Sequence, residues 1–266
     1  MTAVLERTSW TDKSIDLLVH DIVEYDMRDG GLSIIKEEKL LPQYMIGQFD
    51  RMKKGLDRNA AIGKLKHNPK YADIPKQQNE LFRKYRMMFG ELNELKDEDI
   101  LSVKKDAIFS KKFCYNLKIG NFIEFAEKHV YQAYLAIKVK NPNGYKNLEF
   151  YWSEDGHIDV KGINDKIIDK YHKDYTLKVI WKVVRHLTFF DTEGAIKYLI
   201  GFMTDYKRLK LDTQYYRTFN DDSIFPIVFD DKQMLWNDIG PDQLPDCDIS
   251  YNYIQIYTQI LNIIAS

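Results

Sequence analysis

The sequence predicts an α+β fold, in which an antiparallel sheet is interrupted by a helical insertion and followed by a helical C-terminal region. Three observations predict it. β-like runs occur before residue 27 and again between residues 100 and 163, a helical pattern fills residues 42–96, and the chain reads as helical from about residue 163 to 210. Helices that are segregated from strands along the chain are typical of α+β domains.

The first strand is expected at residues 15–25, where apolar and polar positions are mixed. It runs into "EYDMRDGGLSIIK", in which two carboxylates, Asp26 and Asp29, precede the glycine pair Gly30 and Gly31. A plain buried strand has no use for this interruption. The following "LSIIKEEKLLP" predicts a short helix that Pro42 ends.

The insertion is expected to be a pair of helices with a basic side. "YMIGQFDRMKKGLDRNAAIGKL" and "KQQNELFRKYRMMFGELNEL" place apolar residues at spacings of three and four, and "KHNPKYADIP" connects them. Residues 53–86 carry ten Lys or Arg against three acids, whereas residues 221–248 carry eight Asp against one Lys. This asymmetry predicts either a polyanion-binding element beside an acidic one or two oppositely charged, solvated faces.

A β-hairpin with its turn at "KKD" is expected in "ILSVKKDAIF", because apolar runs flank the three polar residues. Further strands are expected in "YQAYLAIKV", "NLEFYW" and "HIDVKGI", with turns at "NPNG" and "SEDG". The chain closes with "YNYIQIYTQILNIIA", an amphipathic helix. We therefore expect a core domain at residues 1–165, carrying the insertion, and a helical C-terminal region at 166–266.

The composition excludes several classes of protein. With 44% hydrophobic and 30% charged residues among 266, the chain is expected to be soluble and globular, and a net charge of −1 argues against a globally basic nucleic-acid binder. Two distant cysteines and scattered histidines predict neither a zinc site nor a disulfide framework. Without a signal peptide or a membrane-length apolar run, we expect a cytoplasmic protein with no membrane partner.

Two carboxylates are the candidates for chemistry, Asp26 and Asp106, because each ends or follows a short apolar strand segment. If the two strands are neighbours, both acids project at one edge of the sheet. Paired carboxylates of this kind hold Mg²⁺ or Mn²⁺ for attack on a phosphate. The alternatives stay open at this point: Asp26 and Asp29 could cap the following helix, and Asp106 could be an ordinary turn residue.

The stretch "DMRDGGLSII" resembles the first catalytic motif of the family B DNA polymerases, D-x-x-S-L-Y-P-S-I-I. Asp26 falls on the metal-binding aspartate of that motif. Asp29 falls on its first serine and Ser33 on its second, and Ile34 and Ile35 match the apolar pair at its end.

Three later stretches resemble further motifs of the same family, in the same order. "SVKKDAIF" is similar to Y-G-D-T-D-S-x-F, with Asp106 at the second aspartate. "KHVY" is similar to K-K-x-Y, which contacts the primer–template duplex, and so matches Lys128 and Tyr131. "VKGI" is similar to the K-G motif and matches Lys161 and Gly162. The resemblance covers residues 18–165 in separate blocks.

The insertion lies where that family places its fingers, in which a helix-borne lysine grips the incoming triphosphate. "KKGLDRNAAIG" resembles K-x-x-x-N-S-x-Y-G and offers Lys54 and Arg58 for this role, followed by Asn59 and Gly63. The resemblance thus implies a palm-like sheet, a fingers-like insertion and a thumb-like C-terminal region.

The implied activity is a metal-dependent nucleotidyltransferase that extends a nucleic-acid 3′ end. Asp26 and Asp106 would bind Mg²⁺ or Mn²⁺. The nucleoside triphosphate would be held by Asp29, Gly30, Gly31, Ser33, Lys54 and Arg58, because backbone without side chains lets phosphate oxygens approach the amides. The primer–template would contact Lys128, Tyr131, Lys161 and Gly162. The short length, with only 25 residues and so no exonuclease domain before the first motif, also suggests a viral or mobile-element accessory protein.

Two residues depart from the family pattern. Gly31 stands where the family has the tyrosine that screens the sugar, which leaves the choice between ribose and deoxyribose open. Lys104 stands where the family has the first aspartate of D-T-D and favours a second hypothesis. A cation beside Asp106 could replace a metal ion by a salt bridge. On this hypothesis the chain keeps the fold without the chemistry and acts as a nucleic-acid- or protein-binding accessory protein or inhibitor, with a protein partner for its Asp-rich segment.

Overall fold

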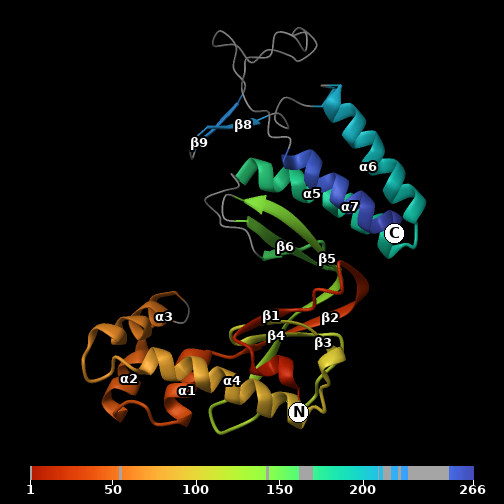
Figure 1. Cartoon of the computed structure of the whole chain (residues 1–266). Coiled ribbons are helices and arrows are strands. Elements are labelled where there is room, and N and C mark those ends of the chain that lie inside the picture. The colour runs from red at the N-terminus through yellow and green to blue at the C-terminus, as the bar shows by residue number, and fades with distance from the viewer. Residues whose placement is uncertain are drawn as a thin grey trace. The chain divides into compact units, whose positions relative to one another are not determined.

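A computed structural model of the chain confirms the α+β prediction (Figure 1). It describes residues 2–53, 56–141, 144–161, 170–208, 210–211, 217–220, 223–226 and 252–266. The Asp-rich segment at 221–248 falls largely outside the described residues. The chain forms two compact units: Met1–Ser14 with His20–Tyr131, and Ile15–Val19 with Gln132–Ser266.

The described strands form a seven-stranded sheet in the order β1-β3-β4-β2-β5-β6-β7 and a separate hairpin of β8 and β9. The pairs β1–β3, β2–β4, β3–β4 and β6–β7 are antiparallel. The bounds are β1 Ser9–Thr11, β2 Leu17–Met27, β3 Ile100–Lys104, β4 Ala107–Ser110, β5 Phe125–Asn141, β6 Gly144–Ser153, β7 Ile158–Lys161, β8 Arg217–Asn220 and β9 Ser223–Pro226. β2 and β5 contribute residues to both units.

The hairpin predicted at "KKD" is β3–β4, and its turn consists of Lys105 and Asp106. Lys105 adopts a φ of 54°, in the left-handed region that a tight turn requires. β4 pairs with β2 so that Asp26 lies opposite Ala107. The two strand ends that carry the candidate acids are therefore neighbours in the sheet, as expected.

The first unit contains the predicted insertion, which is helical, but the first of the two expected helices is divided into α2 and α3, with residues 52 and 53 outside a helix. Its helices are η1 Ala3–Glu6, α1 Gly30–Glu37, α2 Gln43–Arg51, α3 Leu56–Gly63, η2 Lys64–His67, α4 Ile74–Leu92 and η3 Asp97–Asp99. Pro75 stands in the first turn of α4, where its missing N–H costs no hydrogen bond. Figure 1 shows α1, α2 and α3 grouped beside one end of α4.

Two apolar clusters hold this unit together. In the first, Phe82, Tyr85 and Phe89 on one face of α4 pack against the sheet, and the ring of Phe89 lies 5.3 Å from Tyr25 and 4.4 Å from Phe125. The second joins α1, α2, α3, η2 and the start of α4 through Leu32, Ile35, Leu41, Ile46, Phe49, Ile62, Leu65 and Ile74. The insertion therefore has its own core beside that of the sheet.

The second unit packs helices on β5 and β6. They are α5 Lys170–Thr188, α6 Thr192–Lys207 and α7 Asn252–Ala265, and Figure 1 shows them together on one side of these strands. One apolar cluster contains Leu135, Phe150 and Trp152 from the strands and Ile180 and Ile260 from the helices. The strand residues from 132 onward share a core with these helices. The expected division of the chain after residue 165 stays a prediction.

No helix in the described part of the chain is both long and apolar enough to cross a lipid bilayer.

Candidate active site

Asp26 and Asp106 line one pocket of the first unit, with a volume of about 540 Å³. Asp26 is the last residue but one of β2, and Asp106 stands in the β3–β4 turn. The pairing of Asp26 with Ala107 brings the two acids to the same edge. The juxtaposition of acids that the sequence predicts is therefore present.

The pocket opens between this sheet edge and the helical insertion. The sheet and its turn provide Asp26, Met27, Lys105 and Asp106, and the start of α1 provides Asp29, Gly30 and Gly31. The insertion provides Asn59, Ile62, Gly63, Pro75, Gln78, Asn79 and Phe82. Of these insertion residues, the sequence pattern indicated only Asn59 and Gly63.

The carboxyl of Asp26 is in an unfavourable place for a charge. Burial raises the pKa of Asp26 above its ordinary value, and the nearby carboxylates of Asp106 and Glu24 raise it further, while Lys128 lowers it. Its side chain is still 32% exposed. A crowded acid that remains accessible is a favourable partner for a cation from solution.

Lys128 already supplies one positive charge at this acid. Its ammonium Nζ lies 3.5 Å from Asp26 Oδ2 and 3.2 Å from Glu24 Oε1. Burial lowers the pKa of Lys128, but the charges of Glu24 and Asp26 outweigh it and raise that pKa overall. The Tyr131 hydroxyl donates to Glu24 Oε2 at 2.8 Å, and the side chain of Tyr131 has no exposed surface. Lys128 thus lies beside the candidate site, and Tyr131 contacts it through Glu24.

Asp29 has a different partner. Its carboxylate pairs with the guanidinium of Arg58, whose side chain is only 4% exposed. Arg58 also donates from Nη2 to the carbonyl oxygens of Met52, at 2.5 Å, and Asp50, at 3.3 Å. Asp29 occupies the N-cap position of α1, but its side chain makes no capping hydrogen bond. The carboxylate of Asp29 therefore pairs with Arg58 instead of capping the helix. Arg58 itself does not line the pocket.

The glycine pair differs in the room around each residue. A Cβ on Gly30 would lie 2.9 Å from Phe82 Cε1 and 3.3 Å from Asp106 Oδ2, closer than ordinary packing allows. A Cβ on Gly31 would meet its nearest neighbours, Gln78 and Ile62, at 3.6 Å. Gly30 is therefore the position where backbone and the Asp106 carboxylate approach each other.

A buried arginine that the sequence analysis missed holds the turn carrying Asp106. Arg86 on α4 is 1% exposed and donates to the carbonyl oxygen of Lys105 in the turn. It also donates to the carbonyl oxygens of Arg7, at 2.7 Å, and Leu5, at 3.2 Å. Burial lowers the pKa of Arg86 to about 10, and the charge of Asp106 opposes this shift. A basic residue within a basic stretch gave no signal of this role.

The other predicted site residues lie elsewhere. The Ser33 hydroxyl donates to the carbonyl oxygen of Arg28 at 2.7 Å and stands outside the pocket lining. Lys161 belongs to β7 in the second unit and pairs with Asp159 at 2.6 Å. Lys54 and Gly162 lie outside the described residues.

The donors at the pocket suit a hard cation that takes part of its coordination from elsewhere. The described residues contain no group of three or more His, Cys, Asp or Glu that could hold a metal ion. Mg²⁺, however, is commonly bound through one or two carboxylates together with water and substrate phosphates. The pair of Asp26 and Asp106 fits that mode, but it does not fit a site in which protein side chains supply all the ligands.

Lys104, which stands where the family B motif has an aspartate, donates to the Thr11 hydroxyl at 2.8 Å.

Comparison with known proteins gives a family and a structural likeness. The family model described as bacteriophage PBS1 gene 130 protein matches residues 1–266. No curated protein matches the chain. The chain is similar in structure to the family B DNA polymerase from the hyperthermophilic archaeon Pyrobaculum calidifontis, with a TM-score of 0.40 and 14% identity. The match covers 77% of this chain and 35% of the polymerase, so the chain spans about a third of that protein's length.

Proposed function

The chain belongs to the family of the bacteriophage PBS1 gene 130 protein, and we propose that it is a metal-dependent nucleotidyltransferase that adds nucleotides to a nucleic-acid 3′ end. One observation carries the proposal: Asp26, near the end of β2, and Asp106, in the turn that leads into the antiparallel neighbour β4, line the same pocket. On this proposal, the sheet of the first unit acts as a polymerase-like palm and the insertion as its fingers, and the protein works in the cytoplasm of the host cell.

The reaction follows from what the pocket offers. The oxygen of a primer 3′-hydroxyl forms a bond to the α-phosphorus of a nucleoside triphosphate. The bond from that phosphorus to the bridging oxygen breaks, pyrophosphate leaves, and the hydroxyl proton passes to water. Mg²⁺, when bound, neutralises phosphate charge and favours the deprotonated hydroxyl. Asp26 and Asp106 hold negative charge where that cation would bind.

The start of α1 offers a place for the phosphates. The first amides of a helix have no partner within the helix, and here they belong to Gly30 and Gly31, which line the pocket. Lys105 lines the same pocket and supplies a cation, with its ammonium 5.3 Å from the Phe82 ring centroid. Because Arg58 is committed to Asp29, we assign triphosphate neutralisation to Lys105 and, as the sequence suggests, Lys54. Lys128 contacts Asp26 and Glu24, and we assign it to binding of the primer–template.

A second candidate function is a binding or inhibitory protein without catalysis. The contact of 3.5 Å between Lys128 Nζ and Asp26 Oδ2 favours it, because a lysine already provides the charge that a metal ion would bring. Such a protein would act on nucleic acid or on a protein partner. Metal binding distinguishes the two functions, since only the transferase requires it.

Primer extension tests the proposal. A labelled primer–template is incubated with Mg²⁺ or Mn²⁺ and with deoxyribonucleotides or ribonucleotides. The wild type should extend the primer, and Asp26→Asn should not. Asp21→Asn is the matched control, because Asp21 is an exposed carboxylate on the same strand. A folded wild type that extends nothing under either metal would favour the inactive alternative, and equal extension by wild type and Asp26→Asn would exclude Asp26 from the chemistry.

A further inference from the structure

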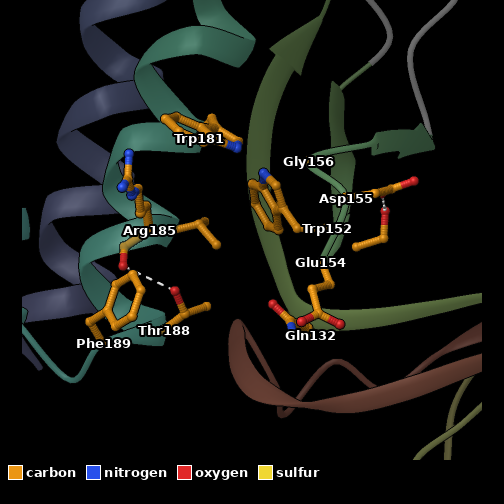
Figure 2. A pocket seen from close by; sticks show the side chains of 11 residues that line it. Gln132, Trp152, Glu154, Asp155, Gly156, Trp181, Arg185, Thr188 and Phe189 are labelled. Carbon is orange, nitrogen blue, oxygen red and sulfur yellow. Dashed lines mark hydrogen bonds between the residues drawn. The ribbon is translucent and has the colours of Figure 1, made fainter.

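The second unit contains another pocket, of about 460 Å³, between the turn joining β6 to β7 and the helix α5 (Figure 2). Trp152 at the end of β6 forms one wall, and Trp181 on α5 forms another. Gly156 in the turn, Arg185 on α5 and Phe189 directly after α5 also line it. We call it the aromatic pocket. Its residues have no part in the function proposed above.

A buried hydrogen-bond donor in this pocket has no acceptor among the described residues. The side chain of Trp152 is 3% exposed, and within the described residues its indole Nε1 has no hydrogen-bond partner. An indole N–H can only donate, and leaving it unpaired away from water is costly. Figure 2 shows the indole of Trp152 in the pocket, with Trp181 across from it. The pocket is therefore suited to a ligand that brings an acceptor to Trp152.

The opposite wall offers flat, accessible rings. Trp181 is 36% exposed although it is a large apolar residue, and the Arg185 guanidinium lies 5.3 Å from its ring centroid. Phe189, directly after the last residue of α5, is 74% exposed. Exposed aromatic rings beside cations are stacking platforms for planar groups.

Cations follow the same face of α5. Three exposed cations lie close to Trp181 in the sequence of α5: Lys178, Lys182 and Arg185. They are spaced four and three residues apart. Residues at spacings of three and four share one face of a helix. Two adjoining hollows both include Trp181 and Lys182, so the cationic face continues from the aromatic pocket.

The acids nearby are mostly engaged within the fold. Asp155 accepts hydrogen bonds from the Ser153 hydroxyl at 2.5 Å and the His157 amide at 3.0 Å. Asp191 pairs with His186 and caps α6 by accepting from the Gly194 amide at 2.9 Å. Glu154 in the turn is exposed and adds one negative charge to the lining, whereas the α5 side carries the positive charges of Lys182 and Arg185.

We propose that the aromatic pocket and the adjoining face of α5 bind single-stranded nucleic acid. One base enters between Trp152 and Trp181, and a carbonyl oxygen or ring nitrogen of that base accepts from Trp152 Nε1. The flanking phosphates contact Lys182 and Arg185. An acidic peptide would also satisfy the cations, but it would have to bring a backbone or carboxylate oxygen to Trp152 separately from the side chain that stacks. A nucleobase carries the stacking ring and the acceptor in one group.

Fluorescence anisotropy of a labelled, single-stranded oligonucleotide of twelve thymidines tests this proposal on the full chain, in EDTA and without triphosphate. Trp181→Ala should weaken binding about 5- to 150-fold, the range measured for lost base stacking. Trp152→Phe keeps a ring and removes the donor, so it should weaken binding by a smaller factor. Lys197→Gln is the control, because Lys197 is an exposed residue of α6 outside the pocket. At the same salt concentration, its affinity for the oligonucleotide should lie within about twofold of the wild-type affinity.

Tryptophan fluorescence provides the second readout. Binding of the oligonucleotide should quench the wild-type signal, and Trp181→Ala should lose most of that quenching. The proposal is overturned if Trp181→Ala binds as tightly as the wild type, or if the oligonucleotide binds without quenching. An acidic peptide that quenches the signal when the oligonucleotide does not would overturn it in favour of a protein partner. If Trp152→Phe does not fold, the Trp181→Ala variant still tests the proposal, because Trp181 is partly exposed.

Discussion

Asp26, at the end of β2, and Asp29, at the start of α1, are three residues apart and line the same pocket, yet their surroundings differ. Asp29 pairs with the buried guanidinium of Arg58, which is itself held by two backbone carbonyls. Asp26 stands beside Asp106 and Glu24, and burial and these acids raise its pKa. Its contact is the half-exposed Lys128, at 3.5 Å.

We infer that Asp29 stabilises the fold, whereas the ionised carboxylate of Asp26 lowers its stability. A buried, paired carboxylate is hard to remove because its partner would be left charged. A carboxylate placed among other carboxylates lowers stability, and such an arrangement is retained where its charge serves a ligand. The predictions below test this contrast, from the largest expected effect to the smallest.

Replacing Asp29 should produce the largest effect on stability. Asp29→Asn keeps a residue that tolerates the φ of 51° at this position but leaves Arg58 without its counter-charge. We expect a loss of about 3–5 kcal/mol in the free energy of unfolding, measured by urea denaturation. Asp50→Asn is the control, because the pair of Asp50 and Lys36 lies at the surface and should contribute at most about 1 kcal/mol. Equal losses in the two variants would contradict the distinction.

Gly30→Ala should reduce nucleotidyl transfer without unfolding the protein. The added methyl group would press on Phe82 and the Asp106 carboxylate and displace that acid. A displacement on the order of 1 Å at a catalytic group can cost about 100-fold in rate. Gly31→Ala has room for its methyl group and should retain most activity. Primer-extension rates compare the two, and an equal loss in both would show that Asp106 is not the affected group.

Tyr131→Phe tests whether Tyr131 serves the fold or, as the sequence predicts, the nucleic acid. The hydroxyl donates to the buried Glu24 carboxylate, and such charge-assisted bonds contribute about 1.5–3 kcal/mol. We expect a loss of that size in the free energy of unfolding, and no loss for Tyr115→Phe, since Tyr115 is 89% exposed. A variant of unchanged stability that binds primer–template more weakly would instead support direct contact.

Asp26→Asn should give the smallest effect, and in the opposite direction. Because folding raises the pKa of Asp26, the ionised acid opposes folding. That penalty is absent below the unfolded-state pKa, grows as pH rises through it, and is complete above the folded-state pKa. The variant should therefore melt roughly 1–3 °C higher than the wild type at neutral pH. The difference should vanish below about pH 3, where aspartate is protonated in both states. A lower melting temperature at neutral pH would show that the contact with Lys128 dominates.

Local patterns predicted the elements that carry the site. The hairpin at Lys105 and Asp106 and the end of the strand at Asp26 follow from short apolar runs bounded by polar residues, and both are present. The helical insertion follows from apolar spacing of three and four. The three-residue strand β1 had no such signal, because its pairing with β3 joins residues about 90 positions apart.

The partners of charged residues could not be predicted in the same way. A basic helical stretch has the same sequence pattern whether its face is solvated or binds a ligand. Arg58 and Arg86 do neither, because both are buried within the fold. Arg58 is buried against Asp29, 29 residues earlier, and Arg86 against the backbone of Leu5 and Arg7, 79 to 81 residues earlier. Only the folded chain shows that these two arginines of the basic stretch are internal.

The central claim is that Asp26 and Asp106 together form a site for a divalent cation and a triphosphate. Electron paramagnetic resonance of Mn²⁺, titrated with a non-hydrolysable nucleoside triphosphate, tests it without requiring turnover. The wild type and Asp21→Asn should bind the Mn²⁺–triphosphate complex, and Asp26→Asn and Asp106→Asn should each bind it at least tenfold more weakly. Binding by all four proteins with equal affinity, or by none, would contradict the claim.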